Sequence, residues 1–363
     1  MSRRVVIKIG SSSLTGADAQ GLSASAVDQL VDAVATLKKS GAEVVIVSSG
    51  AIAAGLAPLG FSARPKDLAT QQAAASVGQG LLVHRYTESL ARYSIVGSQV
   101  LLTIDDVVRR SHYQNVQRTL TKLLQLGVVP IINENDSVGT QEIRFGDNDR
   151  IAALVSHLIS ADLLILVSDV DGLYDAPPSQ PGAKVIQEVA DINSLSSLEI
   201  GGAGSKVGSG GMVTKIEAAR IATSAGIPML LTSLAKIRAA ISGEKVGTLF
   251  KAVSEKKPAR LLWLAHASNP HGVLHVDEGA AKALIERGVS LLPAGVTRVD
   301  GEFSAGDTVE IVDPNGAVIA RGLVGFDSNE IPMMLGRSTK ELARELGAEF
   351  ERELVHRDDL VLL

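Results

Sequence analysis

The chain has 363 residues, 45% of them hydrophobic and 21% charged, which allows two folded domains with sizeable cores. It has no cysteine, which excludes disulfides, thiolate catalysis and cysteine-ligated zinc or iron–sulfur sites. The net charge of −5 gives no support for nucleic acid or an anionic membrane as a partner, and no apolar stretch is long enough to span a bilayer. Together with an N-terminus that lacks a signal-peptide pattern, this composition predicts a cytoplasmic protein.

Residues 1 to about 250 alternate short apolar segments with alanine-rich helical patterns. Strands are predicted at residues 5–9, 43–47, 95–101, 128–132, 163–167 and 228–231. Helices are predicted at residues 24–39, 67–91, 114–126, 150–160 and 212–225. The alternation predicts an α/β fold, a three-layer αβα sandwich with a mainly parallel central sheet that binds ligands beyond the carboxyl ends of its strands.

The pattern changes near residue 250. Residues 253–259 form a polar segment that ends in proline and is typical of a linker. One helical pattern at 277–287 and short strand patterns at 296–299, 308–312 and 318–324 follow it, separated by Gly, Asp and Pro. We therefore expect a first domain at 1–252, a linker at 253–259 and a small β-barrel-like domain at 260–363.

Lys8 lies inside the first apolar segment, directly before Gly10 and Ser11. A cation at the end of a buried strand, next to a glycine and serine loop, indicates an anionic ligand such as phosphate. The alternative is an edge-strand lysine whose amine reaches solvent.

Polar groups also follow three other predicted strands, at Ser48–Gly50, Asn133–Asp136 and Ser168–Asp171. Ser48-Ser49-Gly50 precedes a short helix, where backbone N–H groups bind anions, although an ordinary helix cap has the same composition. Asn133-Glu134-Asn135-Asp136 ends a buried strand, and Asp147-Asn148-Asp149 soon follows. Helix capping explains one of these acids, but a functional site explains both clusters better.

A glycine-rich segment opens the last predicted helix of the first domain, at Gly208-Ser209-Gly210-Gly211-Met212-Val213-Thr214-Lys215. It is neither a P-loop nor a dinucleotide fingerprint, because its lysine and glycines stand at the wrong positions. It offers backbone donors and a lysine one turn into the helix, and a plain glycine-rich linker is the alternative. The spacing of His271 and His275 does not indicate a metal site, and we predict no metal held by the protein itself.

Taken in chain order, Lys8–Ser12, Val47–Gly55, Val129–Asp136, Phe145–Asp149 and Gly208–Lys215 resemble the amino acid kinase family. Within that family they are most similar to the members that phosphorylate free L-glutamate. The tail motifs at 276–284, 290–296, 301–307 and 356–359 resemble a PUA domain. The resemblance covers almost the whole chain.

The resemblance implies transfer of the γ-phosphoryl group of ATP to the γ-carboxylate of L-glutamate, the first step of L-proline synthesis. Lys8 and Lys215 would neutralise charge on the transferred group, and Asp149 would hold both lysines. Residues that would bind glutamate are Ser49, Gly50, Asp136 and Asn148. Residues that would contact the nucleotide are Lys8, Gly10, Ser11, Ser168, Asp169, Ser209, Gly210, Gly211, Met212, Val213, Thr214 and Lys215.

The resemblance also implies Mg²⁺ carried by ATP, feedback inhibition by L-proline, a dimer or tetramer, and a glutamyl-phosphate reductase as partner. Two rivals stay open. Kinases of aspartate, acetylglutamate, carbamate or uridylate share the fold, and PUA domains often accompany RNA-modifying enzymes. RNA is disfavoured because residues 258–363 carry 10 Lys and Arg against 17 Asp and Glu, and few aromatic side chains.

Overall fold

The computed structural model describes residues 3–15, 21–103, 106–107, 110–138, 147–178, 180–197, 209–252 and 270–363. The chain forms two compact units, residues 1–256 and 257–363, and each is described by itself. The predicted linker at 253–259 lies outside the described residues.

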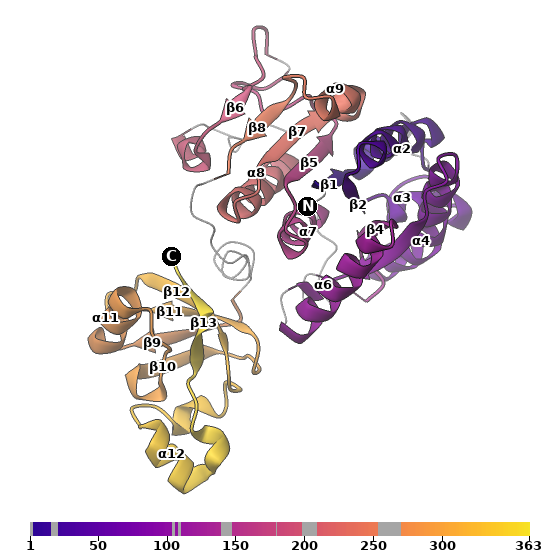
Figure 1. Ribbon diagram of the computed structural model, residues 1–363. Helices are drawn as coiled ribbons and strands as arrows, with labels where there is room; N and C mark the ends of the chain where they lie inside the picture. Colours follow the sequence, from indigo (N-terminus) through magenta and orange to yellow (C-terminus); the bar gives the residue numbers. More distant parts are fainter. Residues whose placement is uncertain are drawn as a thin grey trace. The chain divides into compact units, whose positions relative to one another are not determined.

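The first unit contains eight strands in one sheet, in the order β3-β4-β2-β1-β5-β7-β8-β6 (Figure 1). The strands are β1 (Arg4–Ile9), β2 (Glu43–Ser48), β3 (Gly97–Leu102), β4 (Val129–Glu134), β5 (Leu163–Ser168), β6 (Glu188–Val189), β7 (Met229–Ser233) and β8 (Thr248–Phe250). Every pair in the sheet is parallel except β7 with β8. The predicted parallel sheet is confirmed.

The helices of this unit are α1 (Ser11–Leu14), α2 (Ala24–Lys39), α3 (Ala51–Leu56), α4 (Leu68–Ala91), α6 (Arg110–Gln125), α7 (Asp147–Leu158), α8 (Ser209–Ser224) and α9 (Ile237–Ile241). Helices α2 and α4 cover one face of the sheet, and α7 packs against β1 and β5 from the other. The predicted αβα sandwich is therefore confirmed. The order β4-β2-β1-β5 makes the four strands that end in polar residues direct neighbours.

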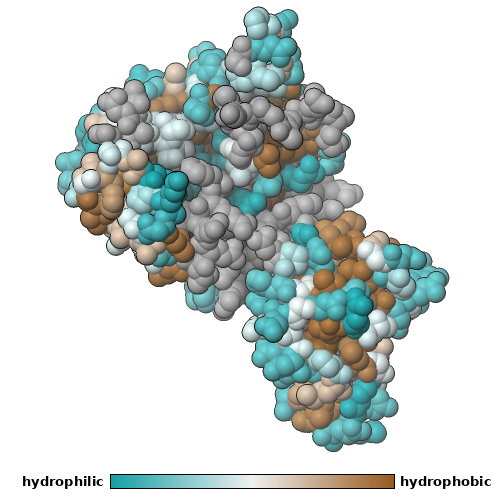
Figure 2. Space-filling view, turned by 180° about the vertical axis from the view of Figure 1, so that it is seen from behind, coloured by the Kyte–Doolittle hydropathy of each residue, from teal (hydrophilic) through white to brown (hydrophobic). Residues whose placement is uncertain are grey.

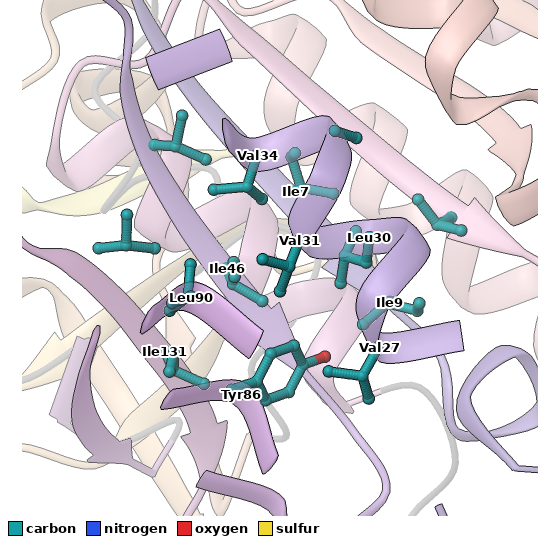
Figure 3. Packing of buried hydrophobic residues seen from close by; sticks show 14 of the residues in the cluster. Ile7, Ile9, Val27, Leu30, Val31, Val34, Ile46, Tyr86, Leu90 and Ile131 are labelled. Atoms are coloured by element: carbon teal, nitrogen blue, oxygen red, sulfur yellow. The ribbon is translucent and has the colours of Figure 1, made fainter. Parts of the chain in front are cut away.

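The main core lies between the sheet and helices α2 and α4 (Figure 3). Ile7 and Ile9 of β1 point into it beside Ile46 of β2 and Ile131 of β4. Because side chains alternate along a strand, Lys8 points to the opposite face, which α7 covers. The pleat of β1 thus separates its core side chains from its cation.

Two glycines let α3 and α4 cross closely. A Cβ on Gly55 would stand 1.9 Å from the Ala74 carbonyl oxygen, and one on Gly78 would stand 1.8 Å from that of Ala51. Backbone contacts this close leave no room for a side chain. The crossing fixes the start of α3, and with it the Ser49-Gly50 segment.

The second unit has a separate five-stranded sheet in the order β10-β9-β11-β12-β13. Its elements are β9 (Gly272–Val276), α11 (Glu278–Arg287), β10 (Val296–Gly301), β11 (Thr308–Val312), β12 (Val318–Val324), α12 (Thr339–Leu346) and β13 (Val355–Leu362). Figure 2 shows hydrophobic residues gathered on one face of this unit, whose exposed apolar side chains include Ile285, Leu292 and Leu362. In the described parts of the chain, no helix has both the length and the apolar character needed to cross a membrane.

Candidate active site

Lys8 is buried at the end of β1, with only 5% of its surface exposed. Its amine forms an ion pair with the Asp149 carboxylate. Burial lowers the pKa of Lys8, and the negative charge of Asp149 opposes that shift. A lysine whose amine reaches solvent is therefore excluded, and a buried cation stands at the carboxyl edge of the sheet.

Asp149 connects this lysine to α8. It lies in the first turn of α7 with 1% of its surface exposed. Its second oxygen lies 3.5 Å from the Lys215 amine and 2.9 Å from the Thr214 hydroxyl. Burial pushes the pKa of Asp149 up, but the charges of Lys8 and Lys215 outweigh it and hold the pKa below its ordinary value. One ionised carboxylate thus holds two cations that come from different elements.

The glycine-rich segment forms the first turn of α8. Ser209, Gly210 and Gly211 begin the helix, and Met212 and Val213 follow them. The Lys215 amine lies 3.0 Å from the Gly211 carbonyl oxygen, so the lysine folds back over this turn. Since the first N–H groups of a helix have no partner inside it, this turn combines backbone donors with a cation.

Gly10 and the end of β5 border the same cluster. A Cβ on Gly10 would stand 3.6 Å from the Lys8 amine, an ordinary contact distance, so this loop lies directly beside the cation. Ser11 begins the short helix α1 directly after it. At the end of β5 the Ser168 hydroxyl donates to the Asp169 carboxylate over 2.9 Å. The negative charge of Asp169 also helps to raise the pKa of Lys8, against the larger effect of burial. The ends of β1 and β5 therefore meet at the buried lysine.

A second cluster consists of amides and a hydroxyl at the ends of β2 and β4. Asn148 Nδ2 lies 3.0 Å from Ser49 Oγ and 3.0 Å from Asn133 Oδ1. The backbone N–H of Glu134 donates to Asn148 Oδ1 over 3.2 Å, and Asn133 Nδ2 donates to Gln79 Oε1 over 2.8 Å. Because Asn148 directly precedes Asp149, the start of α7 sends one side chain into each cluster.

Gly50 adopts a left-handed conformation with φ of 108°, which glycine tolerates, and it precedes α3. Asp136 lies half-buried in the turn after β4. Desolvation lowers the pKa of the Arg64 guanidinium, and the negative charge of Asp136 opposes that shift. Arg64 also donates to Gln71 Oε1 over 2.8 Å.

The structure thus places six of the predicted site residues in two adjoining clusters. Lys8, Asp149, Thr214 and Lys215 form the first, and Ser49, Asn148 and Asn133 form the second. Sequence reasoning missed Gln79 and Arg64. A spacing of seven residues places Gln79 on the same face of α4 as Tyr86, whose hydroxyl lies 2.9 Å from the Ser48 hydroxyl, and that spacing was the available signal.

In the described ranges, no group of three or more His, Cys, Asp and Glu side chains could hold a metal ion. Asp149 is occupied by two lysines and a threonine, so it fits a charge-bearing role between cations.

The chain is similar to known proteins over its whole length. Residues 3–233 match the amino acid kinase family, and residues 272–346 match the PUA domain. The glutamate 5-kinase of Streptomyces coelicolor is 60% identical over 363 residues, which cover 100% of this chain and 97% of that protein. The glutamate 5-kinase of Bifidobacterium longum (strain NCC 2705) is 52% identical over 360 residues, which cover 99% of this chain and 95% of that protein.

A solved carbamate kinase from Giardia lamblia, bound to AMP-PNP, shares the fold at a TM-score of 0.51. It is 19% identical and covers 69% of this chain and 99% of its own. The chain belongs to the amino acid kinase family and, within it, to the glutamate 5-kinases that carry a C-terminal PUA domain.

Proposed function

We propose that this chain transfers the γ-phosphoryl group of ATP to the γ-carboxylate of L-glutamate, forming ADP and L-glutamyl 5-phosphate. The observation that carries the proposal is the buried Lys8–Asp149–Lys215 cluster, directly beside the amide cluster of Asn148 and Ser49. The lysine cluster suits a phosphoryl group, and the amide cluster suits the polar ends of an amino acid. The glutamate 5-kinases at 60% and 52% identity support the same acceptor.

The reaction needs alignment and charge compensation more than proton transfer. A glutamate side chain ionises near pH 4.3, so its γ-carboxylate is already a nucleophile at neutral pH. One γ-carboxylate oxygen forms a bond to the γ-phosphorus while the bond to the β,γ-bridging oxygen breaks, and that electron pair leaves with ADP. Lys8 and Lys215 stabilise the charge on the transferred group from two sides, while Asp149 keeps both amines in place.

The other predicted residues divide between the two substrates. Ser49, Gly50, Asn148 and Asp136 bind glutamate, with Asp136 facing its ammonium group. Gly10, Ser11, Ser168, Asp169 and the first turn of α8 line the nucleotide site. Mg²⁺ enters with ATP and offsets part of the phosphate charge, which suits a site whose buried carboxylate already binds two lysines.

The family resemblance carries four further parts of the proposal. We propose inhibition by L-proline at a site that overlaps the glutamate site, and a dimer or tetramer as the assembly. We also propose delivery of the labile product to a glutamyl-phosphate reductase, and a cytoplasmic location. The PUA domain has a structural or regulatory role. If deletion of residues 260–363 left both the fold and the regulation of the enzyme unchanged, that role would be contradicted.

Hydroxamate formation tests the reaction, because hydroxylamine traps an acyl phosphate. With ATP and Mg²⁺, L-glutamate should give hydroxamate, while aspartate, N-acetylglutamate and carbamate should not. Lys8→Met should abolish the signal. Lys251→Met removes a lysine whose amine lies 2.7 Å from Glu188 on the same unit, and it should leave the signal intact. Folded protein that binds ATP yet gives no hydroxamate with L-glutamate would overturn the proposal.

A further inference from the structure

The hydrogen bonds of the amide cluster run in one fixed donor-to-acceptor direction, and a backbone N–H group sets that direction. The N–H of Glu134 can only donate, so the Asn148 atom that it meets at 3.2 Å is the carboxamide oxygen. The amide nitrogen of Asn148 then faces the other way. A flipped Asn148 carboxamide would place its NH₂ group against this N–H, so only one orientation of the side chain allows the bond.

The direction passes from Asn148 to its neighbours. Both hydrogens of Asn148 Nδ2 are used, one toward Ser49 Oγ and one toward Asn133 Oδ1, each over 3.0 Å. Since Asn133 presents its oxygen to Asn148, its nitrogen must face Gln79 Oε1, 2.8 Å away. Asn133 is only 1% exposed, so bulk water does not reach its amide nitrogen.

This chain of hydrogen bonds through Gln79, Asn133 and Asn148, here called the relay, leaves Ser49 as a donor. Its oxygen accepts from Asn148, so the hydroxyl hydrogen is not used by that bond and is available to a ligand. A carboxylate only accepts hydrogen bonds, and it therefore requires a donor at this position. With the relay reversed, Ser49 would present lone pairs to a bound carboxylate, and the two would repel.

Gln79 closes the relay from α4. It is 8% exposed, and among the described residues its Nε2 atom has no hydrogen-bond partner. A buried unpaired N–H is a cost that native proteins rarely carry without a reason. The unpaired nitrogen follows from the direction of the relay, because Asn133 needs the oxygen of Gln79 and the nitrogen is left over.

We propose that Gln79 is a positioning residue for glutamate: its carboxamide oxygen locks Asn133 and Asn148 in the orientation that makes Ser49 a donor to a substrate carboxylate. The inference rests on the proposed function and deepens it, because it assigns a residue of α4 to the substrate site. Without the oxygen of Gln79, the buried Asn133 nitrogen lacks an acceptor. Asn133 then rotates, and Asn148 loses one of its two acceptors.

The test is steady-state kinetics of Gln79→Met, which keeps the length and volume of the side chain but removes the acceptor. The KM for L-glutamate should rise roughly tenfold, as expected for one buried hydrogen bond. The KM for ATP and kcat should stay within about twofold, because the lysine cluster is untouched. Gln117→Met is the matched control: Gln117 donates to the Leu158 carbonyl over 3.0 Å, and its loss should leave all three constants unchanged.

A double-mutant cycle separates positioning from a merely structural role. If Gln79 acts through Ser49, Gln79→Met should raise the KM for glutamate by less than about twofold in a Ser49→Ala background. Equal tenfold effects in both backgrounds, or a glutamate KM unchanged by Gln79→Met alone, would overturn the proposal. Wild-type protein that forms no hydroxamate from glutamate would overturn the proposed function and this inference with it, so the two failures are distinguishable.

Discussion

Asp149→Asn tests whether one carboxylate holds the two lysines. The substitution keeps the shape of the side chain and leaves an oxygen for the Thr214 hydroxyl, which lies 2.9 Å from Asp149. It removes the negative charge of Asp149, whose side chain is 1% exposed and contacts both Lys8 and Lys215. The two amines then repel each other at the site where we propose that ATP places its γ-phosphate.

Two magnitudes follow. Removing one partner of a buried ion pair lowers the free energy of unfolding by about 3–5 kcal/mol. For a unit of this size, one kcal/mol corresponds to roughly 2–4 °C, so the Tm of the first unit should fall by roughly 6–20 °C. Displaced lysines weaken stabilisation of the transferred group, and kcat should fall about 10²–10³-fold. The KM for glutamate should change little, because Ser49 and Asn148 keep their contacts.

The assays are thermal unfolding and hydroxamate kinetics at a temperature where the variant is folded. Asp32→Asn is the control, since Asp32 lies 3.0 Å from Arg92 and 2.7 Å from Arg238 in another ion-pair network. It should lower stability without a comparable loss of kcat. A kcat for Asp149→Asn within tenfold of wild type would refute the reasoning, because the lysines would then not need the carboxylate.

Four further outcomes are expected. Lys215→Met should lower kcat about 10²–10³-fold with a near-normal KM for glutamate, and a mainly raised KM would contradict its placement at the transferred group. Tyr86→Phe should lower the free energy of unfolding by roughly 1 kcal/mol in urea titrations, since it removes the 2.9 Å bond to Ser48, and kcat should be unchanged. Gly78→Ala should lower the Tm and raise the KM for glutamate, because its Cβ would displace α3; normal values for both would show that the crossing can relax. The contribution of Asp149 to stability should be complete above pH 3.8 and be lost as the pH falls toward its lowered folded-state pKa, so Asp149→Asn should show a smaller loss of stability in acid than wild type.

The parallel sheet could be predicted because most of its strands are short, largely apolar segments that alternate with helical patterns. The order of the strands could not, since it depends on crossovers that local periodicity does not encode. That order makes the ends of β4, β2, β1 and β5 neighbours. Strand β13 (Val355–Leu362) was missed because His356, Arg357 and Asp358 interrupt its apolar pattern, and these side chains are exposed in the structure.

Lys8 stood out in the sequence because a charge inside an apolar strand needs a partner. The partner could not be identified among the acids of 133–149, since only the start of α7 determines that Asn148 and Asp149 serve different clusters. The signal for Gln79 was its spacing of seven residues from Tyr86, and it was weak because a glutamine in an alanine-rich helix is typical of a solvated face. Its burial follows from the packing of α4 against the sheet.

The most direct test of the account uses L-glutamate labelled with oxygen-18 in both γ-carboxylate oxygens, with ATP, Mg²⁺ and hydroxylamine. If the γ-carboxylate attacks the γ-phosphorus, one labelled oxygen becomes the bridge of the acyl phosphate. Hydroxylamine then attacks the carbonyl carbon, and the phosphate departs with that oxygen. The account predicts inorganic phosphate that carries one oxygen-18 atom. Unlabelled phosphate would contradict it, because the carboxylate would then never have bonded to phosphorus.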